Sequence, residues 1–157
     1  MYVKARLWIV LFSIGFLLLT ACSENRVNDK EVFLWYAEQI GFKLPKGKHS
    51  VIIVPTSSCS GCRKAAVDYG DLHKDESTVI VSGNIASDFD NRRIVVDDNS
   101  LCDNLNWSHS NVIEVSVNNG EVSGVKSYDA LESIKRFAGI DVSAIENCTE
   151  ENCRITK

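Results

Sequence analysis

Two patterns of apolar residues alternate along this chain and predict a mixed α/β domain. Between residues 32 and 40, Val, Phe, Trp, Tyr and Ile recur at helical spacing, and Gly41 follows as a stop signal. We expect a packed helix whose aromatic side chains belong to the core. The short apolar run Val51–Val54 predicts a buried strand, a helix is expected over residues 60–73, and residues 78–81 are a second β-rich run. Strand, helix and strand in this order predict a parallel βαβ unit.

The second half of the chain carries a hairpin signal. Asn119-Gly120 lies between two β-rich segments, residues 112–117 and 121–125, and this dipeptide favours a two-residue turn between antiparallel strands. The remaining predicted elements are a short helix over residues 85–91, a third strand over 93–96 and a closing helix over 128–137.

The N-terminus predicts export. Two basic residues precede the apolar stretch 7–19, which is shorter than a comfortable membrane span, as in a signal peptide. Residues 19–22 have the sequence LTAC, which resembles a bacterial lipobox. The resemblance implies that Cys22 is diacylated and becomes the first mature residue. An uncleaved anchor helix is the alternative, and it places the domain beside the same membrane. Ser23, where an Asp would signal inner-membrane retention in enterobacterial lipoproteins, points to the outer membrane.

Charge and length predict a single acidic domain. Removal of residues 1–21 takes away two basic residues and no acidic one, so the formal net charge falls from −4 to about −6. About 136 residues remain, which suits one domain with a single core. We expect a lipid-anchored tether over 22–28, a folded domain over 29–140 and a cysteine-containing tail over 141–157. The acidic balance, without a run of basic residues, argues against binding of nucleic acid.

The segment Cys59-Ser60-Gly61-Cys62 follows the Val51–Val54 strand directly and opens the next predicted helix. Unpaired N–H groups and the positive end of the helix dipole at such a junction favour the thiolate form of the first cysteine. We therefore expect Cys59 to be the nucleophile. Cys62 stands one turn further on, where it can attack a mixed disulfide at Cys59 and resolve it.

The order of these elements, with CSGC at the first strand–helix junction and VSVNNGEV near the end, resembles the thioredoxin fold over roughly residues 51–137. The resemblance implies an α/β fold with a central mixed sheet flanked by helices, here with an additional N-terminal helix. The segment SSCSGC is also similar to that of small thioredoxin-like lipoproteins. We expect an envelope protein, lipid-anchored and facing the periplasm or the cell surface, that exchanges disulfides with protein thiols and needs no cofactor. The direction of electron flow stays open, because reduction potentials differ widely among proteins with this motif.

Two departures from the thioredoxin pattern bear on the mechanism. Thioredoxins carry a cis-proline before the first hairpin strand, and the corresponding place, near Asn111 or Val112, holds no proline. A non-proline cis bond costs several kcal/mol, so we expect a trans loop there. The Val51–Val54 strand also lacks the buried acid that thioredoxins use as a proton acceptor. Glu114 and Asp97 are the candidates to replace it.

Copper binding is an alternative function. His109-Ser110 precedes the hairpin strand as a His-Ser pair does in Sco-type copper-delivery proteins, which share this fold. Cys59, Cys62 and His109 would then be the copper ligands, because thiolates select Cu(I) and imidazole suits copper. Sco-type proteins space their cysteines by three residues, whereas this chain has two between them. A purely structural Cys59–Cys62 disulfide in a non-catalytic interaction lipoprotein also stays open.

Three further cysteines, Cys102, Cys148 and Cys153, are an odd number and cannot all pair with one another. The simplest interpretation is a local disulfide between Cys148 and Cys153, which would order the polar C-terminal tail.

Overall fold

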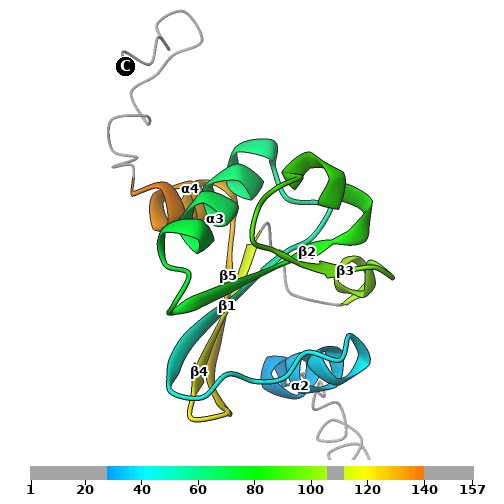
Figure 1. The fold of residues 1–157 in the computed structure, drawn as a ribbon, viewed down its shortest axis with the longest axis vertical. Helices are drawn as coiled ribbons and strands as arrows, with labels where there is room; N and C mark the ends of the chain where they lie inside the picture. The colour runs from blue at the N-terminus through cyan, green and yellow to red at the C-terminus, as the bar shows by residue number, and fades with distance from the viewer. Residues whose placement is uncertain (1–27, 106–111, 140–157) are drawn as a thin grey trace, which may run out of the picture.

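The computed structural model describes residues 28–105 and 112–139, which form an α/β fold around one five-stranded mixed sheet. Figure 1 shows helix α2 below the sheet and helices α3 and α4 above it, so the thioredoxin-like fold class predicted from the sequence is confirmed. The strand order is β3-β2-β1-β4-β5. The strands are β1 (Lys48–Val54), β2 (Ser77–Ser82), β3 (Val95–Asp97), β4 (Val112–Asn118) and β5 (Glu121–Tyr128), and the helices are α2 (Asp29–Gln39), α3 (Ser60–Leu72) and α4 (Ala130–Ala138).

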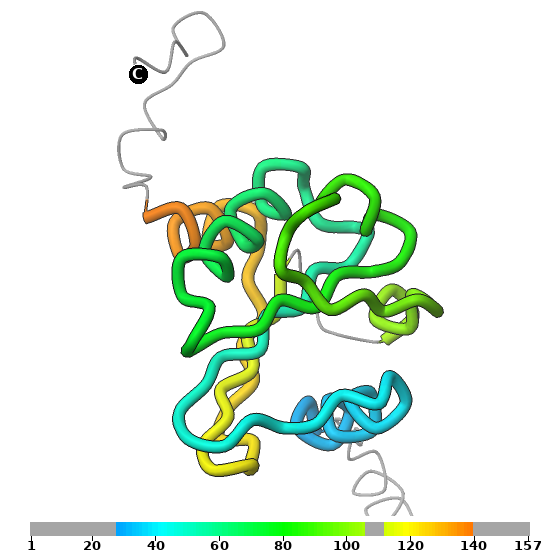
Figure 2. Tube along the Cα trace, viewed as in Figure 1, coloured from blue at the N-terminus to red at the C-terminus, as the bar shows by residue number. Residues whose placement is uncertain are grey.

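Strand β1 lies at the centre of the sheet and is buried on both faces. It runs parallel to β2 and antiparallel to β4. Val51 and Ile53 pack in the cluster that includes α2, whereas Ile52 and Val54 pack in the cluster beneath α3 and α4. Burial on both faces explains why this strand is a continuous apolar run rather than an alternating one. Figure 2 traces the chain from α2 on one side of this strand to α4 on the other.

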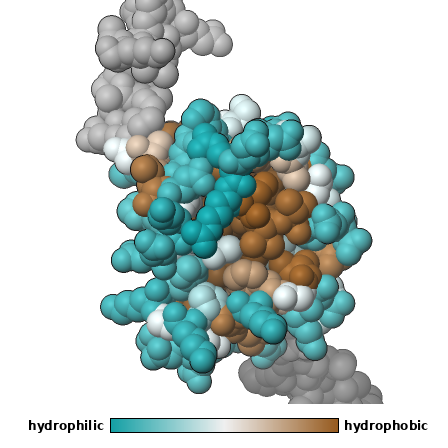
Figure 3. Space-filling view, in the orientation of Figure 1, coloured by the Kyte–Doolittle hydropathy of each residue, from teal (hydrophilic) through white to brown (hydrophobic). Residues whose placement is uncertain are grey.

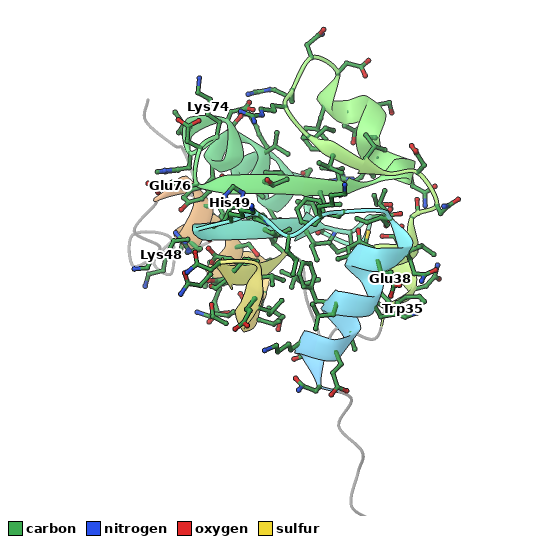
Figure 4. The ribbon with its side chains drawn as sticks, turned by 60° about the horizontal axis from the view of Figure 1, so that its bottom comes forward. Trp35, Glu38, Lys48, His49, Lys74 and Glu76 are labelled. Atoms are coloured by element: carbon green, nitrogen blue, oxygen red, sulfur yellow. A yellow bond between two sulfur atoms is a disulfide. The ribbon has the colours of Figure 1, made fainter. Side chains whose placement is uncertain are left out.

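As predicted, helix α2 packs on one face of the sheet and contributes to the core there, but only some of its aromatic side chains are buried. Phe33 and Tyr36 are fully buried, whereas Trp35 is 49% exposed. Figure 4 shows Trp35 beside Glu38 on the outer side of the helix. The prediction that all of these aromatics belong to the core was therefore wrong for Trp35, because residue 35 faces away from the stripe that 33 and 36 share.

The predicted hairpin is confirmed. Asn119 and Gly120 have φ angles of 53° and 82°, which is the pair of positive values that a tight turn between β4 and β5 requires. Tyr128 ends β5 instead of opening the final helix. Asp129 caps that helix, because its side chain accepts the Glu132 N–H at 2.8 Å.

The segment between β2 and β4 departs most from prediction. The short helix expected over residues 85–91 is a 3₁₀ helix, η1 (Gly83–Phe89), and the third strand is shifted toward the C-terminus. A second 3₁₀ helix, η2 (Leu101–Asn104), was not predicted. Strand β3 ends at a buried Asp97, whose carboxylate accepts the Tyr36 hydroxyl at 3.1 Å. This partner from α2 offsets part of the cost of burying the acid, whereas the other carboxylate oxygen, Oδ1, is buried without a hydrogen-bond partner among the described residues.

Helix α3 approaches β2 closely at Gly70. A Cβ at Gly70 would overlap the Val79 side chain, so the absence of a side chain allows the close contact. Across residues 28–105 and 112–139, no helix combines the length and apolar character needed to cross a bilayer.

Candidate functional site

Cys59 and Cys62 are joined by a disulfide at the start of α3, with their Cα atoms 5.0 Å apart. Cys59 is the N-cap of the helix, and its Sγ accepts the Cys62 N–H at 3.0 Å. The first sulfur thus lies against the unpaired N–H groups of the helix, where a thiolate would be stabilised. This is the arrangement expected from the strand–CSGC–helix order in the sequence.

The two sulfurs differ in accessibility. Cys59 is partly exposed, whereas Cys62 is fully buried among apolar residues that include Val54 and Phe137. The Cys62 Sγ lies 3.5 Å from the Ala130 carbonyl oxygen at the start of α4. In the reduced state that carbonyl can accept a hydrogen bond from a thiol at Cys62, and such a bond favours the neutral form. The geometry therefore separates an accessible first sulfur from a protected second one.

The basic residues after the second cysteine have acidic partners. Arg63 lies 3.7 Å from Asp88, and Lys64, which is largely exposed, pairs with Asp68 one helical turn away. Lys64–Asp68 is a surface pair, and Arg63–Asp88 is a long contact with an exposed Asp88, so both contribute little, and each carboxylate offsets the positive charge. The helix terminus, rather than Arg63 or Lys64, is accordingly the main local feature that favours a Cys59 thiolate.

Glu114 is on the same face of the sheet as Cys62, but its carboxylate is fully engaged. The Arg136 Nη2 and Nε atoms donate at 2.7 and 3.0 Å, Tyr128 donates its hydroxyl at 2.7 Å, and Ser50 donates at 3.0 Å. Burial acts to raise the pKa of Glu114, but these hydrogen bonds outweigh it and lower the pKa below its usual value. Burial and the hydrogen bond to Glu114 raise the pKa of Tyr128 to about 12.

Asp97 lies on the other face of the sheet, in the layer of α2. Its Oδ2 accepts the Tyr36 hydroxyl and, at 2.9 Å, the Cys102 N–H. Neither Asp97 nor Glu114 is thus placed as a free proton acceptor beside Cys62. Cys102 is a free thiol that is 1% exposed, and burial raises its pKa.

Sequence reasoning missed a polar network in front of the dithiol. Thr56, which lies between β1 and Cys59, donates both its N–H and its hydroxyl to Asp103 at 2.7 Å. Ser82 and Asn84 also donate to Asp103. No spacing rule could have found this network, because 47 positions separate Thr56 from Asp103 and η2 was not predicted.

A groove of about 290 Å³ runs between α3 and η1, with Ser60 of the CSGC segment in its wall. Val67 and Phe89 supply its apolar lining, and charged residues of α3 and the η1 region surround them. Figure 3 shows that apolar surface on this side of the molecule gathers near β2 and β3, framed by polar side chains.

A larger groove of about 430 Å³ lies at the opposite end of β1 from the disulfide. Lys48, His49 and Glu76 are among its lining residues, and Figure 4 shows them together with Lys74 around the start of β1. His49 has its Nε2 2.9 Å from the Thr78 hydroxyl, and burial lowers its pKa. The groove is remote from the cysteines, none of which lines it.

The other candidate residues, Cys22, His109, Cys148 and Cys153, lie outside the described residues. Within the described ranges, no three or more His, Cys, Asp or Glu side chains gather as metal ligands would, and every peptide bond there is trans. In comparisons with known proteins, neither a family model nor a curated sequence matches this chain.

Proposed function

We propose that this protein exchanges disulfides with partner proteins through Cys59 and Cys62, at a bacterial cell envelope to which Cys22 anchors it. The observation that carries the proposal is the asymmetry of the pair. Cys59 is the partly exposed N-cap of α3 and accepts a backbone N–H, whereas Cys62 is buried against a carbonyl. This asymmetry suits a nucleophile and a resolving thiol, and a purely structural disulfide does not require it.

The exchange proceeds in two balanced steps. The Cys59 thiolate attacks one sulfur of a partner disulfide, so a Cys59–partner bond forms, the partner S–S bond breaks and a partner thiolate leaves. The Cys62 thiol then gives its proton to that thiolate or to solvent and attacks the Cys59 sulfur. The Cys59–Cys62 disulfide forms and the second partner thiolate leaves, so two electrons pass from this protein to its partner. The same steps in reverse oxidise a partner dithiol.

Substitution of the two cysteines tests the assignment. In the reduced protein, the alkylation rate of Cys59 should have its pH midpoint well below the pKa near 8.5 of an unperturbed thiol, because the helix terminus stabilises the Cys59 thiolate. Cys59→Ser should abolish exchange with a model protein disulfide, and Cys62→Ser should accumulate mixed disulfides. Ser60→Ala is the matched control, since it changes the exposed residue between the cysteines and leaves both thiols intact.

Retention of normal exchange in both cysteine variants would refute the proposal. Negligible exchange by the parent protein, together with stoichiometric copper binding that His109→Ala abolishes, would instead favour the copper-binding alternative.

A further inference from the structure

We propose that Asp103 is a positioning residue of the dithiol, and that its carboxylate holds the loop before Cys59 in the geometry that exchange requires. The inference rests on the proposed exchange function and adds to it a residue that does not touch the reacting sulfurs.

The two oxygens of Asp103 bind Thr56 at two points. Oδ1 accepts the Thr56 N–H and Oδ2 accepts the Thr56 hydroxyl, both at 2.7 Å. A contact to both the backbone and the side chain of one residue fixes its position and its orientation, whereas a single hydrogen bond leaves rotation free. Asp103 therefore determines how the chain leaves the end of β1.

Asp103 is itself held by the neighbouring strand. Ser82, fully buried at the end of β2, donates to Oδ2 at 2.8 Å, and Asn84 of η1 donates to the same oxygen at 3.2 Å. Burial acts to raise the pKa of Asp103, but the hydrogen bonds from Thr56, Ser82 and Asn84 outweigh it and lower the pKa. The carboxylate is thus ionised near neutral pH, and its hydrogen bonds are of the stronger, charge-assisted kind.

The pair of hydrogen bonds from Thr56 to Asp103, called the clamp below, lies close in sequence to the reactive Cys59 sulfur. Strand β1 ends at Val54, so the sheet no longer holds the chain at Thr56. Only two residues separate Thr56 from Cys59, and the Ser58 N–H donates to the Pro55 carbonyl at 3.0 Å across the intervening turn. A shift of Thr56 is therefore passed to Cys59 through a short, hydrogen-bonded turn.

Electrostatics alone would give Asp103 the opposite effect. A carboxylate near a developing thiolate disfavours it, so a charge effect predicts faster exchange when Asp103 is neutralised. A positioning effect predicts slower exchange when the acceptor oxygens are removed. The two roles can accordingly be separated by comparing a variant that keeps an acceptor with one that keeps none.

The experiment compares Asp103→Ala and Asp103→Asn in the full chain, with Asp98→Ala as control. Asp98 is exposed, and its side chain makes no hydrogen bond or ion pair to another described residue. The readout is the rate constant of exchange with a model protein disulfide, divided by the thiolate fraction of Cys59 from its alkylation pH profile. Urea unfolding gives the folded fraction of each variant.

We expect this rate constant to fall about tenfold in Asp103→Ala, as the loss of charge-assisted hydrogen bonds suggests. Asp103→Asn keeps an oxygen for the Thr56 N–H and should stay within about threefold of the parent, and Asp98→Ala should be unchanged. An unaltered rate constant in Asp103→Ala would overturn the proposal and leave Asp103 a stabilising residue only. Faster exchange in both Asp103→Ala and Asp103→Asn would also overturn it, because the charge of Asp103 rather than its positioning of Thr56 would then be decisive.

Two further measurements keep the test decisive. If Asp103→Ala does not fold, Thr56→Val removes one of the two contacts to Thr56, and an unchanged rate constant in that variant overturns the proposal. If the parent protein itself shows no exchange, the proposed function fails separately. The Cys59–Cys62 reduction potential, measured against glutathione, then tests the clamp, and it should differ between Asp103→Ala and the parent but not between Asp98→Ala and the parent.

Discussion

At the scale of single residues, the dithiol and the buried acids of this protein have separate roles. The Cys59 sulfur accepts a hydrogen bond from the Cys62 backbone N–H, and the Cys62 sulfur lies against the Ala130 carbonyl oxygen. Glu114 is a candidate proton acceptor from the sequence, but its carboxylate oxygens already accept hydrogen bonds from Arg136, Tyr128 and Ser50. A carboxylate with both oxygens occupied and a lowered pKa stabilises the fold rather than accepting a proton near neutral pH.

The Glu114–Arg136 pair should therefore make stability depend on pH. Because the folded-state pKa of Glu114 is depressed, its contribution is fully present above the unfolded value near 4.5 and is lost as pH falls through the lower folded value. We expect Glu114→Gln to lower the free energy of unfolding by about 2 kcal/mol at pH 7, and the difference from the parent to shrink below pH 4.5. Urea unfolding at several pH values measures this.

The matched control is Glu121→Gln, an exposed acid in the same hairpin. A Glu114→Gln effect that is as large at pH 3 as at pH 7 would contradict the ion-pair explanation.

At the scale of elements, the sequence predicts what local pattern determines and misses what distant partners determine. Strand β1 follows from its apolar run, and the hairpin follows from Asn119-Gly120. The end of β3 could not be placed, because the buried Asp97 depends on a hydrogen bond from Tyr36, sixty-one positions away, and on one from Cys102 in the unpredicted helix η2. The clamp at Asp103 escaped prediction for the same reason: its partners come from the ends of two strands.

Helix α2 allows a direct test of which aromatic residues form the core. Phe33→Ala should lower the free energy of unfolding by about 3–5 kcal/mol, because Phe33 is fully buried against the sheet. Trp35→Ala is the control on the same helix, and since Trp35 is 49% exposed its cost should be about 1 kcal/mol or less. Denaturant unfolding of both variants gives the values, and equal losses would show that α2 packs differently from the structure.

At the scale of the whole molecule, the described domain is joined at its N-terminal side to the segment that holds the predicted lipid anchor. Helix α2 begins at Asp29, seven positions after Cys22, and packs on the face of the sheet opposite to α3. A seven-residue connection spans at most about 25 Å when extended. If Cys22 is lipidated, the domain therefore stays close to the membrane, and its partners must be reached there.

The anchor can be tested independently of the redox chemistry. Cys22→Ser removes the only side chain that the lipobox resemblance offers for diacylation, so labelled fatty acid should no longer be incorporated and a larger, unprocessed precursor should accumulate in the membrane fraction. Ser23→Asp is the matched variant: it keeps Cys22 and should retain lipidation, while moving the protein to the inner membrane of an enterobacterial host. Incorporation of label that persists in Cys22→Ser would refute the lipobox, and an unchanged membrane distribution of Ser23→Asp would remove the argument for the outer membrane. Neither variant changes a residue of the described domain, so disulfide exchange by Cys59 and Cys62 should continue in both.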